Sequence, residues 1–264
     1  MTPIFTMDIN FYKYQGTGND FIMIDNRQSL FSKNDTKLIA RLCDRRFGIG
    51  ADGLILLESD PEYDFRMVYF NSDGGEGSMC GNGGRCIVAF ARDLGIIRDK
   101  TRFIAVDGPH EASIEGDLIS LKMQDVNNID RNSGSFFLDT GSPHHVQEIT
   151  ELESYPVKEE GARIRYDLYG EKGSNVNFVK PEGENQFFVR TYERGVEDET
   201  YSCGTGVTAV ALAMHGKRND HPEEYVIRTL GGELKVRFRW TGDHYAEIYL
   251  VGPADQVFKG KLVC

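Results

Sequence analysis

The sequence lacks several features that would assign it to a common class of protein. Its 30 lysines and arginines are outnumbered by 41 aspartates and glutamates, giving a formal net charge of −11, and it has no basic run that could follow a phosphate backbone. No apolar stretch reaches the roughly 18 residues of a membrane span. Residues 1–8 lack the basic and apolar regions of a secretion signal. The composition therefore indicates a cytoplasmic protein that binds neither nucleic acid nor membrane.

Cysteine is also scarce. Five cysteines are scattered over 264 residues, without the Cys-x-x-Cys spacing of a zinc ribbon or a thioredoxin-like site. An odd number of scattered thiols favours a reduced state in the cell. Three of the five, Cys43, Cys86 and Cys264, are interpreted as small apolar residues of a core.

The other two cysteines belong to a short signature that occurs twice. Residues 79–84 read Met-Cys-Gly-Asn-Gly-Gly, and residues 202–207 read Ser-Cys-Gly-Thr-Gly-Val. Each signature is followed by an apolar stretch of helical length, which places both cysteines at the start of a helix. Free N–H groups and the positive end of the helix dipole favour a thiolate there. The separation of 123 positions between the two cysteines predicts an internal duplication.

Short strand-like runs dominate the rest of the chain. One amphipathic helix is predicted over residues 35–47, capped by Ser32 or Asn34 and ended by Gly48. The two stretches after the cysteine signatures are apolar on nearly every side, so both helices must be enclosed. The runs predicted as strands are 10–14, 21–25, 54–57, 65–70, 103–106, 118–123, 175–179, 187–192, 225–229, 233–240, 246–251 and 256–263.

These patterns predict an α+β fold of two pseudo-symmetric halves. Each half is expected to wrap a curved, mostly antiparallel sheet around one buried central helix, with the active site in the interdomain cleft. The first half is expected to span residues 1–122 and carry Cys80, and the second to span 123–252 and carry Cys203. The final strand, within 253–264, is expected to return to the first half.

Two matched thiols allow three uses: a redox disulfide, a nucleophile with an auxiliary thiol, or an acid–base pair. A redox pair commonly lies close in sequence, and a nucleophile needs one cysteine with a histidine base. Two equivalent thiols suit a reaction in which the same proton transfer takes place on either face of one carbon. Racemisation and epimerisation are reactions of this kind. One thiolate would remove a proton from a stereocentre, and the opposite thiol would return one. Two helix N-termini could stabilise the carbanion without a cofactor.

The chain resembles the diaminopimelate epimerases, cofactor-independent enzymes that interconvert LL- and meso-2,6-diaminoheptanedioate in lysine and peptidoglycan precursor biosynthesis. The resemblance covers nearly the whole chain, because eight short motifs occur in the family's order. They are residues 16–21 (GTGNDF), 46–53 (RFGIGADG), 70–74 (FNSDG), 79–86 (MCGNGGRC), 143–144 (PH), 175–178 (NVNF), 192–195 (YERG) and 202–206 (SCGTG).

The resemblance implies that Cys80 and Cys203 are the two catalytic bases. It also implies a small-molecule substrate, no cofactor, no metal and a homodimer. His144 and Glu193 would tune the thiols. The implied substrate-binding residues are Asn19, Asn71, Gly81, Asn82, Asn175, Glu193, Arg194, Gly204 and Thr205. Among them, Arg194 can grip a carboxylate as a planar fork, and Glu193 can accept from an ammonium.

Two positions depart from the family pattern. Ser142 stands where the family commonly has asparagine, and Gly53 where some relatives have glutamine.

Proline and hydroxyproline racemases also use paired cysteines, but they tend to have a histidine after the first Cys-Gly and a proline before the second cysteine. Here those positions are Asn82 and Ser202. A non-catalytic thiol switch is the alternative from another class, and activity in reductant that is lost on oxidation would favour the enzyme.

Overall fold

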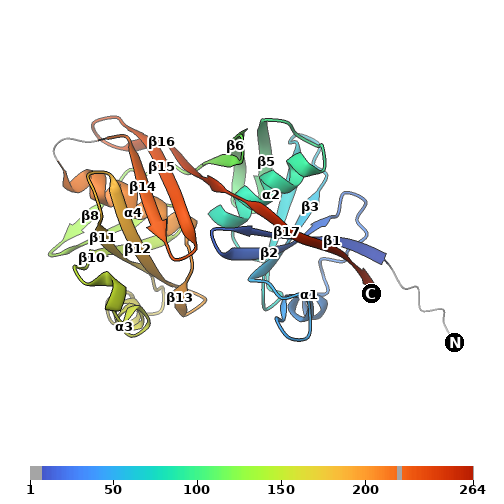
Figure 1. Cartoon of the computed structure of the whole chain (residues 1–264), viewed down its shortest axis with the longest axis horizontal. Helices are drawn as coiled ribbons and strands as arrows, with labels where there is room; N and C mark the ends of the chain where they lie inside the picture. The colour runs from blue at the N-terminus through green and yellow to red at the C-terminus, as the bar shows by residue number, and fades with distance from the viewer. Residues whose placement is uncertain (1–7, 219–221, 264) are drawn as a thin grey trace. The chain divides into compact units, whose positions relative to one another are not determined.

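The structure is a computed structural model that describes residues 8–218 and 222–263 (Figure 1). Cys264 therefore lies outside the described residues. The chain divides into two compact units, one of Met1–Ile119 with Ala254–Cys264 and one of Ser120–Pro253. The sequence-based boundary between two functional halves at residue 122 stays a prediction.

The first unit surrounds one helix with strands. Strand β1 pairs antiparallel with both β2 and β17, so the end of the chain lies beside its beginning. Parallel pairs join β2 to β3 and β4 to β5, and antiparallel pairs join β3 to β4 and β5 to β6. Its elements are β1 (Asp8–Gly16), β2 (Asn19–Asp25), α1 (Thr36–Cys43), β3 (Gly53–Glu58), β4 (Phe65–Asn71), α2 (Gly81–Asp93), β5 (Lys100–Ala105), β6 (Gly108–Glu115) and β17 (Asp255–Val263).

The second unit has the same plan. Strands β10 and β11 are parallel, as are β12 and β14, and the pairs β11–β12, β14–β15 and β15–β16 are antiparallel. Strand β7 (Leu118–Lys122) crosses the boundary between the units. The other elements are β8 (Asp130–Asn132), β9 (Ser135–Asp139), β10 (Pro143–Glu148), the 3-10 helix η1 (Leu152–Ser154), α3 (Val157–Tyr169), β11 (Asn175–Pro181), β12 (Gln186–Glu193), β13 (Asp198–Thr200), α4 (Gly204–Lys217), β14 (Glu224–Thr229), β15 (Gly232–Trp240) and β16 (Tyr245–Pro253).

Each unit encloses the helix that follows a cysteine signature. Helix α2 packs against β1, β2, β3 and β17, and residues 81–91 of this helix are all buried. Helix α4 packs against strands of the second unit from β9 to β16, and Val207–His215 is buried without a break. A helix without a polar face gains free energy only when it is covered all round. The predicted α+β class and the enclosure of both helices are confirmed.

The predicted helix over residues 35–47 is too long. Helix α1 ends at Cys43, because the side chain of Asp44 accepts hydrogen bonds from the backbone N–H groups of Arg46 and Phe47, each at 2.7 Å, and holds a turn there. Its N-cap is Asp35, whose Oδ1 accepts from the N–H of Leu38, in place of the predicted Ser32 or Asn34.

Several elements lie where the sequence prediction placed none: β6, β8, β9, β10, β13 and α3. Helix α3 carries many charged residues and buries only Val157, Gly161 and Ile164, so its apolar periodicity is weak. A Cβ on Gly161 would lie 2.3 Å from the Cβ of Tyr192, so this glycine lets α3 approach β12 closely. The close approach of α3 to β12 cannot be predicted from the sequence of α3 alone.

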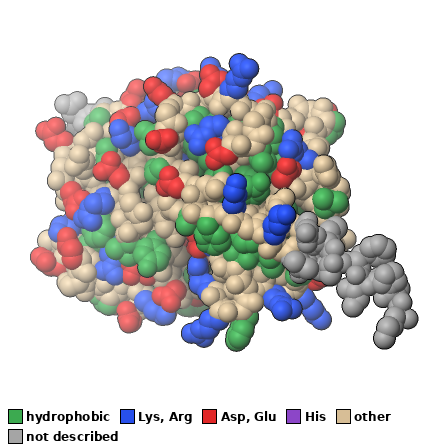
Figure 2. All heavy atoms as spheres, turned by 45° about the vertical axis from the view of Figure 1, so that its right-hand side comes forward, with side chains coloured by type: hydrophobic (Ala, Val, Ile, Leu, Met, Phe, Trp, Pro, Cys, Tyr) green, Lys and Arg blue, Asp and Glu red, His purple; other side chains and the backbone are tan. Residues whose placement is uncertain are grey.

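The described residues contain no helix with the length and apolar character needed to cross a bilayer. On the face drawn in Figure 2, lysine and arginine side chains are interspersed with aspartate and glutamate.

Candidate active site

Cys80 occupies the N-cap of α2. Its backbone is extended (φ −110°, ψ 132°), and its carbonyl accepts the first helical hydrogen bond, from the N–H of Gly84 at 2.7 Å. The N–H groups of the first turn have no carbonyl partner within the helix, so partial positive charge gathers beside the sulfur. Gly81 and Asn82 in this turn are buried, whereas Cys80 is half-buried.

Three amide and guanidinium groups form a chain beside Cys80. The Cys80 Sγ lies 3.6 Å from Oδ1 of Asn19, and the side-chain amide of Asn82 donates to the same oxygen at 3.3 Å. The guanidinium of Arg85 donates to Oδ1 of Asn82 at 3.0 Å and to the hydroxyl of Thr17 at 3.2 Å. Because Arg85 can only donate, it fixes the orientation of the Asn82 amide. The structure therefore brings Cys80, Asn19 and Asn82 together.

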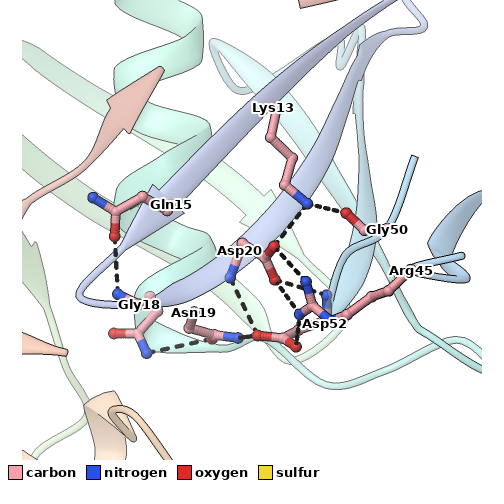
Figure 3. A network of polar contacts seen from close by, with 9 residues as sticks. Lys13, Gln15, Gly18, Asn19, Asp20, Arg45, Gly50 and Asp52 are labelled. Atoms are coloured by element: carbon pink, nitrogen blue, oxygen red, sulfur yellow. Dashed lines mark hydrogen bonds and ion pairs between the residues drawn. The ribbon is translucent and has the colours of Figure 1, made fainter. Parts of the chain in front are cut away.

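A network of charged groups holds Asn19 from the other side (Figure 3). Asn19 donates to the Asp52 carboxylate at 2.7 Å, so its oxygen is the atom left to face Cys80. Arg45 bridges Asp52 and Asp20 at 2.6 and 2.7 Å. Lys13, only 5% exposed, pairs with Asp20 at 2.7 Å and also donates to the carbonyl of Gly50.

Electrostatics in this network favour the charged form of Asp20. Burial raises the pKa of Asp20, but hydrogen bonds from Arg45 and Lys13 more than offset it and bring the pKa to about 2. Burial lowers the pKa of Arg85 to about 10, against the opposing effect of Cys86 and Cys80. Arg85 therefore stays protonated at neutral pH.

Cys203 repeats this arrangement at the start of α4. It is the N-cap, with extended backbone (φ −120°, ψ 111°), and its carbonyl accepts from the N–H of Val207 at 2.8 Å. Its Sγ lies 3.5 Å from the hydroxyl of Thr205, and the side chain is 8% exposed. Gly204 in the same turn is buried. Both cysteines thus stand at the positive end of an enclosed helix.

His144 lies on the other side of Thr205. Its Nε2 is 2.9 Å from the Thr205 hydroxyl, and its Nδ1 is 3.1 Å from the side-chain amide nitrogen of Asn177. Burial, aided by the charge of Arg194, lowers the pKa of His144 to about 3. The imidazole is therefore neutral at physiological pH. The next residue, His145, points to the opposite face of β10, where its Nδ1 contacts the Tyr169 hydroxyl at 2.8 Å.

The end of β12 lies beside the start of β11. The side-chain oxygen of Asn175 accepts from the backbone N–H of Arg194 at 2.9 Å, and its amide donates to the carbonyl of Pro143 at 3.3 Å. The guanidinium of Arg194 donates to the carbonyl of Lys172 at 2.9 Å. The carboxylate of Glu193 accepts from the Thr200 hydroxyl at 2.9 Å.

The remaining predicted residue, Asn71, is exposed at the end of β4 and pairs in register with Gly53 on β3. A Cβ on Gly53 would lie 2.5 Å from both the carbonyl oxygen of Phe70 and the ring of Tyr69. A side chain at this position would therefore require both the backbone of Phe70 and the ring of Tyr69 to shift. At Ser142, the backbone carbonyl accepts from the N–H of Thr140 at 3.1 Å.

Sequence reasoning missed several residues of these clusters, among them Asp52 and Asn177. Both stand inside the quoted motifs, and Asn177 lies two positions after Asn175 on β11, so the strand period puts both side chains on one face. Cys43 and Cys86 are buried thiols, and burial raises the pKa of each, that of Cys43 to about 12. Within the described ranges, no three His, Cys, Asp or Glu side chains form a group that could hold a metal ion.

Comparison with known proteins places this site in a family. Residues 11–127 and 136–257 match the diaminopimelate epimerase family. The chain is 58% identical over 250 residues to the diaminopimelate epimerase of Flavobacterium psychrophilum, covering 94% of this chain and 98% of the relative. It is 42% identical over 259 residues to that of Chlorobaculum tepidum, with the same coverages of 94% and 98%.

The chain belongs to the diaminopimelate epimerase family. It is an isomerase of that family, and the resemblance to the family that the sequence indicates is confirmed. Solved structures share the fold at low identity. A PhzF-family phenazine biosynthesis protein of Bacillus anthracis matches with a TM-score of 0.78 at 15% identity, covering 98% of this chain and all of that one. A hydroxyproline epimerase of Agrobacterium vitis matches with a TM-score of 0.71 at 12% identity, covering 97% and 92%.

Proposed function

We propose that the protein interconverts LL- and meso-diaminopimelate by a two-base mechanism in which Cys80 and Cys203 act on opposite faces of one Cα. The observation that carries the proposal is the repeated half-site. Each thiol is the N-cap of an enclosed helix, where unpaired N–H groups and the helix dipole favour the thiolate. Membership of the family supplies the substrate class.

The Cα–H bond is weakly acidic, so the carbanion that forms on its loss must be stabilised. N–H groups at the first turns of α2 and α4 would bind the reacting α-carboxylate through Gly81, Asn82, Gly204 and Thr205, without a cofactor or a metal. These donors are fixed before the substrate arrives, so they need no reorganisation as negative charge develops. The thiol that faces the carbanion then returns a proton to the other face.

The far end of the substrate carries a second ammonium and a second carboxylate. In our proposal Arg194 binds that carboxylate and Glu193 the ammonium, while Asn19, Asn71 and Asn175 supply neutral contacts. Arg194 donates to the carbonyl of Lys172, and Glu193 accepts from the hydroxyl of Thr200, so the substrate would replace or share these partners. His144 would act near Cys203 as a neutral hydrogen-bonding group, in keeping with its lowered pKa.

The resemblance further leads us to propose a cytoplasmic homodimer that supplies lysine and peptidoglycan precursors. Sedimentation or size-exclusion chromatography with light scattering tests the oligomeric state.

The two-base mechanism is tested by removing each thiol alone. Cys80→Ala and Cys203→Ala are each expected to lower turnover by about 10²–10⁴-fold, the scale of a positioned acid or base. Cys43→Ala is the control, because it removes a buried thiol that belongs to neither of the two cysteine signatures. Each single variant should still exchange the α-proton of the isomer that faces its remaining thiol. Turnover near that of the wild type in either variant contradicts the mechanism.

A further inference from the structure

Asn177 is a fully buried amide whose two side-chain atoms are held by different partners. Its Oδ1 accepts from the Thr191 hydroxyl at 3.0 Å. Its Nδ2 donates to the backbone carbonyl of His145 at 2.9 Å and lies 3.1 Å from Nδ1 of His144. A flipped amide would set Oδ1 against the His145 carbonyl, and two acceptors would then meet without a proton. The His145 carbonyl therefore fixes Nδ2 as the atom that faces His144.

This orientation determines which nitrogen of His144 carries the proton. Since Nδ2 of Asn177 donates to it, Nδ1 must be the bare nitrogen. Burial and the charge of Arg194 keep the ring neutral, so its one proton sits on Nε2. Nε2–H then donates to the Thr205 hydroxyl oxygen at 2.9 Å.

The hydroxyl of Thr205 has a single hydrogen, which cannot point at a nitrogen that is itself donating. The Cys203 Sγ lies 3.5 Å from the hydroxyl oxygen, within range for a bond to sulfur. We infer that Asn177 is a positioning residue, which fixes the Nε2–H tautomer of His144 and so directs the Thr205 hydroxyl hydrogen at the sulfur of Cys203. In the other tautomer Thr205 would donate to His144, and the bond to sulfur would need a proton from the thiol.

The backbone around Asn177 is fitted to this side chain. A Cβ on Gly206 would lie 2.3 Å from Oδ1 of Asn177, so the first turn of α4 packs directly on the amide. Among charged groups, Arg194 acts on His144 electrostatically, and the carboxylate of Glu193, its neighbour in sequence, accepts from the Thr200 hydroxyl. The inference rests on the proposed role of Cys203 as an acid–base, but the tautomer itself can be measured without substrate.

Nitrogen-15 NMR of the imidazole rings tests the tautomer, because the protonated and bare nitrogens give distinct signals. His144→Gln identifies the His144 resonances. We expect Nε2–H in the wild type. Asn177→Asp replaces the donor with an acceptor of the same shape and should move the ring proton to Nδ1. Thr191→Val is the matched control, because it removes the contact to Oδ1 only and should leave the tautomer unchanged.

The effect of Asn177 on Cys203 is measured by following thiolate absorbance against pH. The measurement uses a protein that also carries Cys80→Ala and Cys264→Ser, so that these two thiols do not contribute. Cys43 and Cys86 keep raised pKa values and do not interfere near neutral pH. Adding Asn177→Asp or Asn177→Leu should raise the pKa of Cys203 by about one unit, the scale of one hydrogen bond to a charged group. With both catalytic thiols present, each change should lower kcat more than it raises KM.

A wild-type ring protonated on Nδ1 overturns the inference even if no Asn177 variant folds. So does a tautomer that moves in Asn177→Asp while the thiol titration stays unchanged. If the tautomer and titration behave as expected but the wild type does not epimerise diaminopimelate, the proposed function fails and the inference about Asn177 stands.

Discussion

Asp20→Asn would break the charged network behind Asn19 while keeping the shape of the side chain. In the wild type, Asp20 is paired with Lys13 and Arg45 at 2.7 Å each. The substitution leaves the Lys13 ammonium, 5% exposed, without its carboxylate and with the Gly50 carbonyl as a neutral partner. We expect a clear loss in the free energy of unfolding.

The size of the loss follows from the pKa of Asp20. Its fall from 3.8 to about 2 corresponds to roughly 2 kcal/mol at about 1.4 kcal/mol per unit. This figure already includes the loss of the partner of Lys13, because the pKa shift measures how much more the folded protein stabilises the charged carboxylate than the neutral carboxyl. Because Arg45 is largely exposed, solvent screening reduces its share of this stabilisation. A loss of about 2 kcal/mol at pH 7 is expected.

Urea unfolding of wild type and variant at several pH values measures this loss. The pKa of Asp20 is lower in the folded state, so its contribution is present above the unfolded pKa near 4 and is lost as pH falls toward 2. The difference between the two proteins should shrink by about half at pH 3. Asp25→Asn is the control, because Asp25 pairs with its near neighbour Arg27, whose side chain is 41% exposed. A variant as stable as the wild type at pH 7, or a difference that grows on acidification, refutes this reasoning.

Three further outcomes are expected. Arg194→Lys keeps the charge but loses the planar grip on a carboxylate, so KM for diaminopimelate should rise about tenfold or more; an unchanged KM in steady-state assays rules out this role. Gly206→Ala would bring a Cβ to 2.3 Å from Oδ1 of Asn177, so we expect lower kcat with retained circular dichroism, and full activity would contradict the close fit. Treatment with EDTA, or with hydroxylamine and dialysis, should leave activity intact in reductant, whereas mild oxidation should abolish activity until reductant is added. Loss of activity on EDTA treatment, with recovery when zinc is added, would mean that a metal takes part.

The sequence was sufficient to predict the elements around the two thiols. Glycine-rich turns before all-apolar stretches indicate helices that must be enclosed, and α2 and α4 are enclosed within their units. The last strand, β17, pairs with β1, which lies more than 200 positions earlier in the sequence. The strand-like run at 256–263 indicated the strand itself but not its partner.

The rest of the candidate site depends on contacts between residues distant in sequence. Asp52 fixes the amide of Asn19 from 33 positions away, and Asn177 reaches His144 across 33 positions. Nothing in the local pattern marks Asp52 as part of the site, and the two-residue spacing from Asn175 shows only that Asn177 shares its face of β11. The end of α1 was mispredicted for the opposite reason, because the side chain of Asp44 bonds to its own neighbours and stops a helix that the apolar pattern would continue.

The central claim is that two thiols carry out proton exchange at one Cα, and incubation with LL-diaminopimelate in deuterated water tests it most directly. NMR should show meso product with deuterium at the inverted carbon, formed by the reduced wild type. No such product should form when both Cys80 and Cys203 are replaced by alanine. Absence of labelled meso product from the wild type, or labelling that persists in the double variant, would contradict the account.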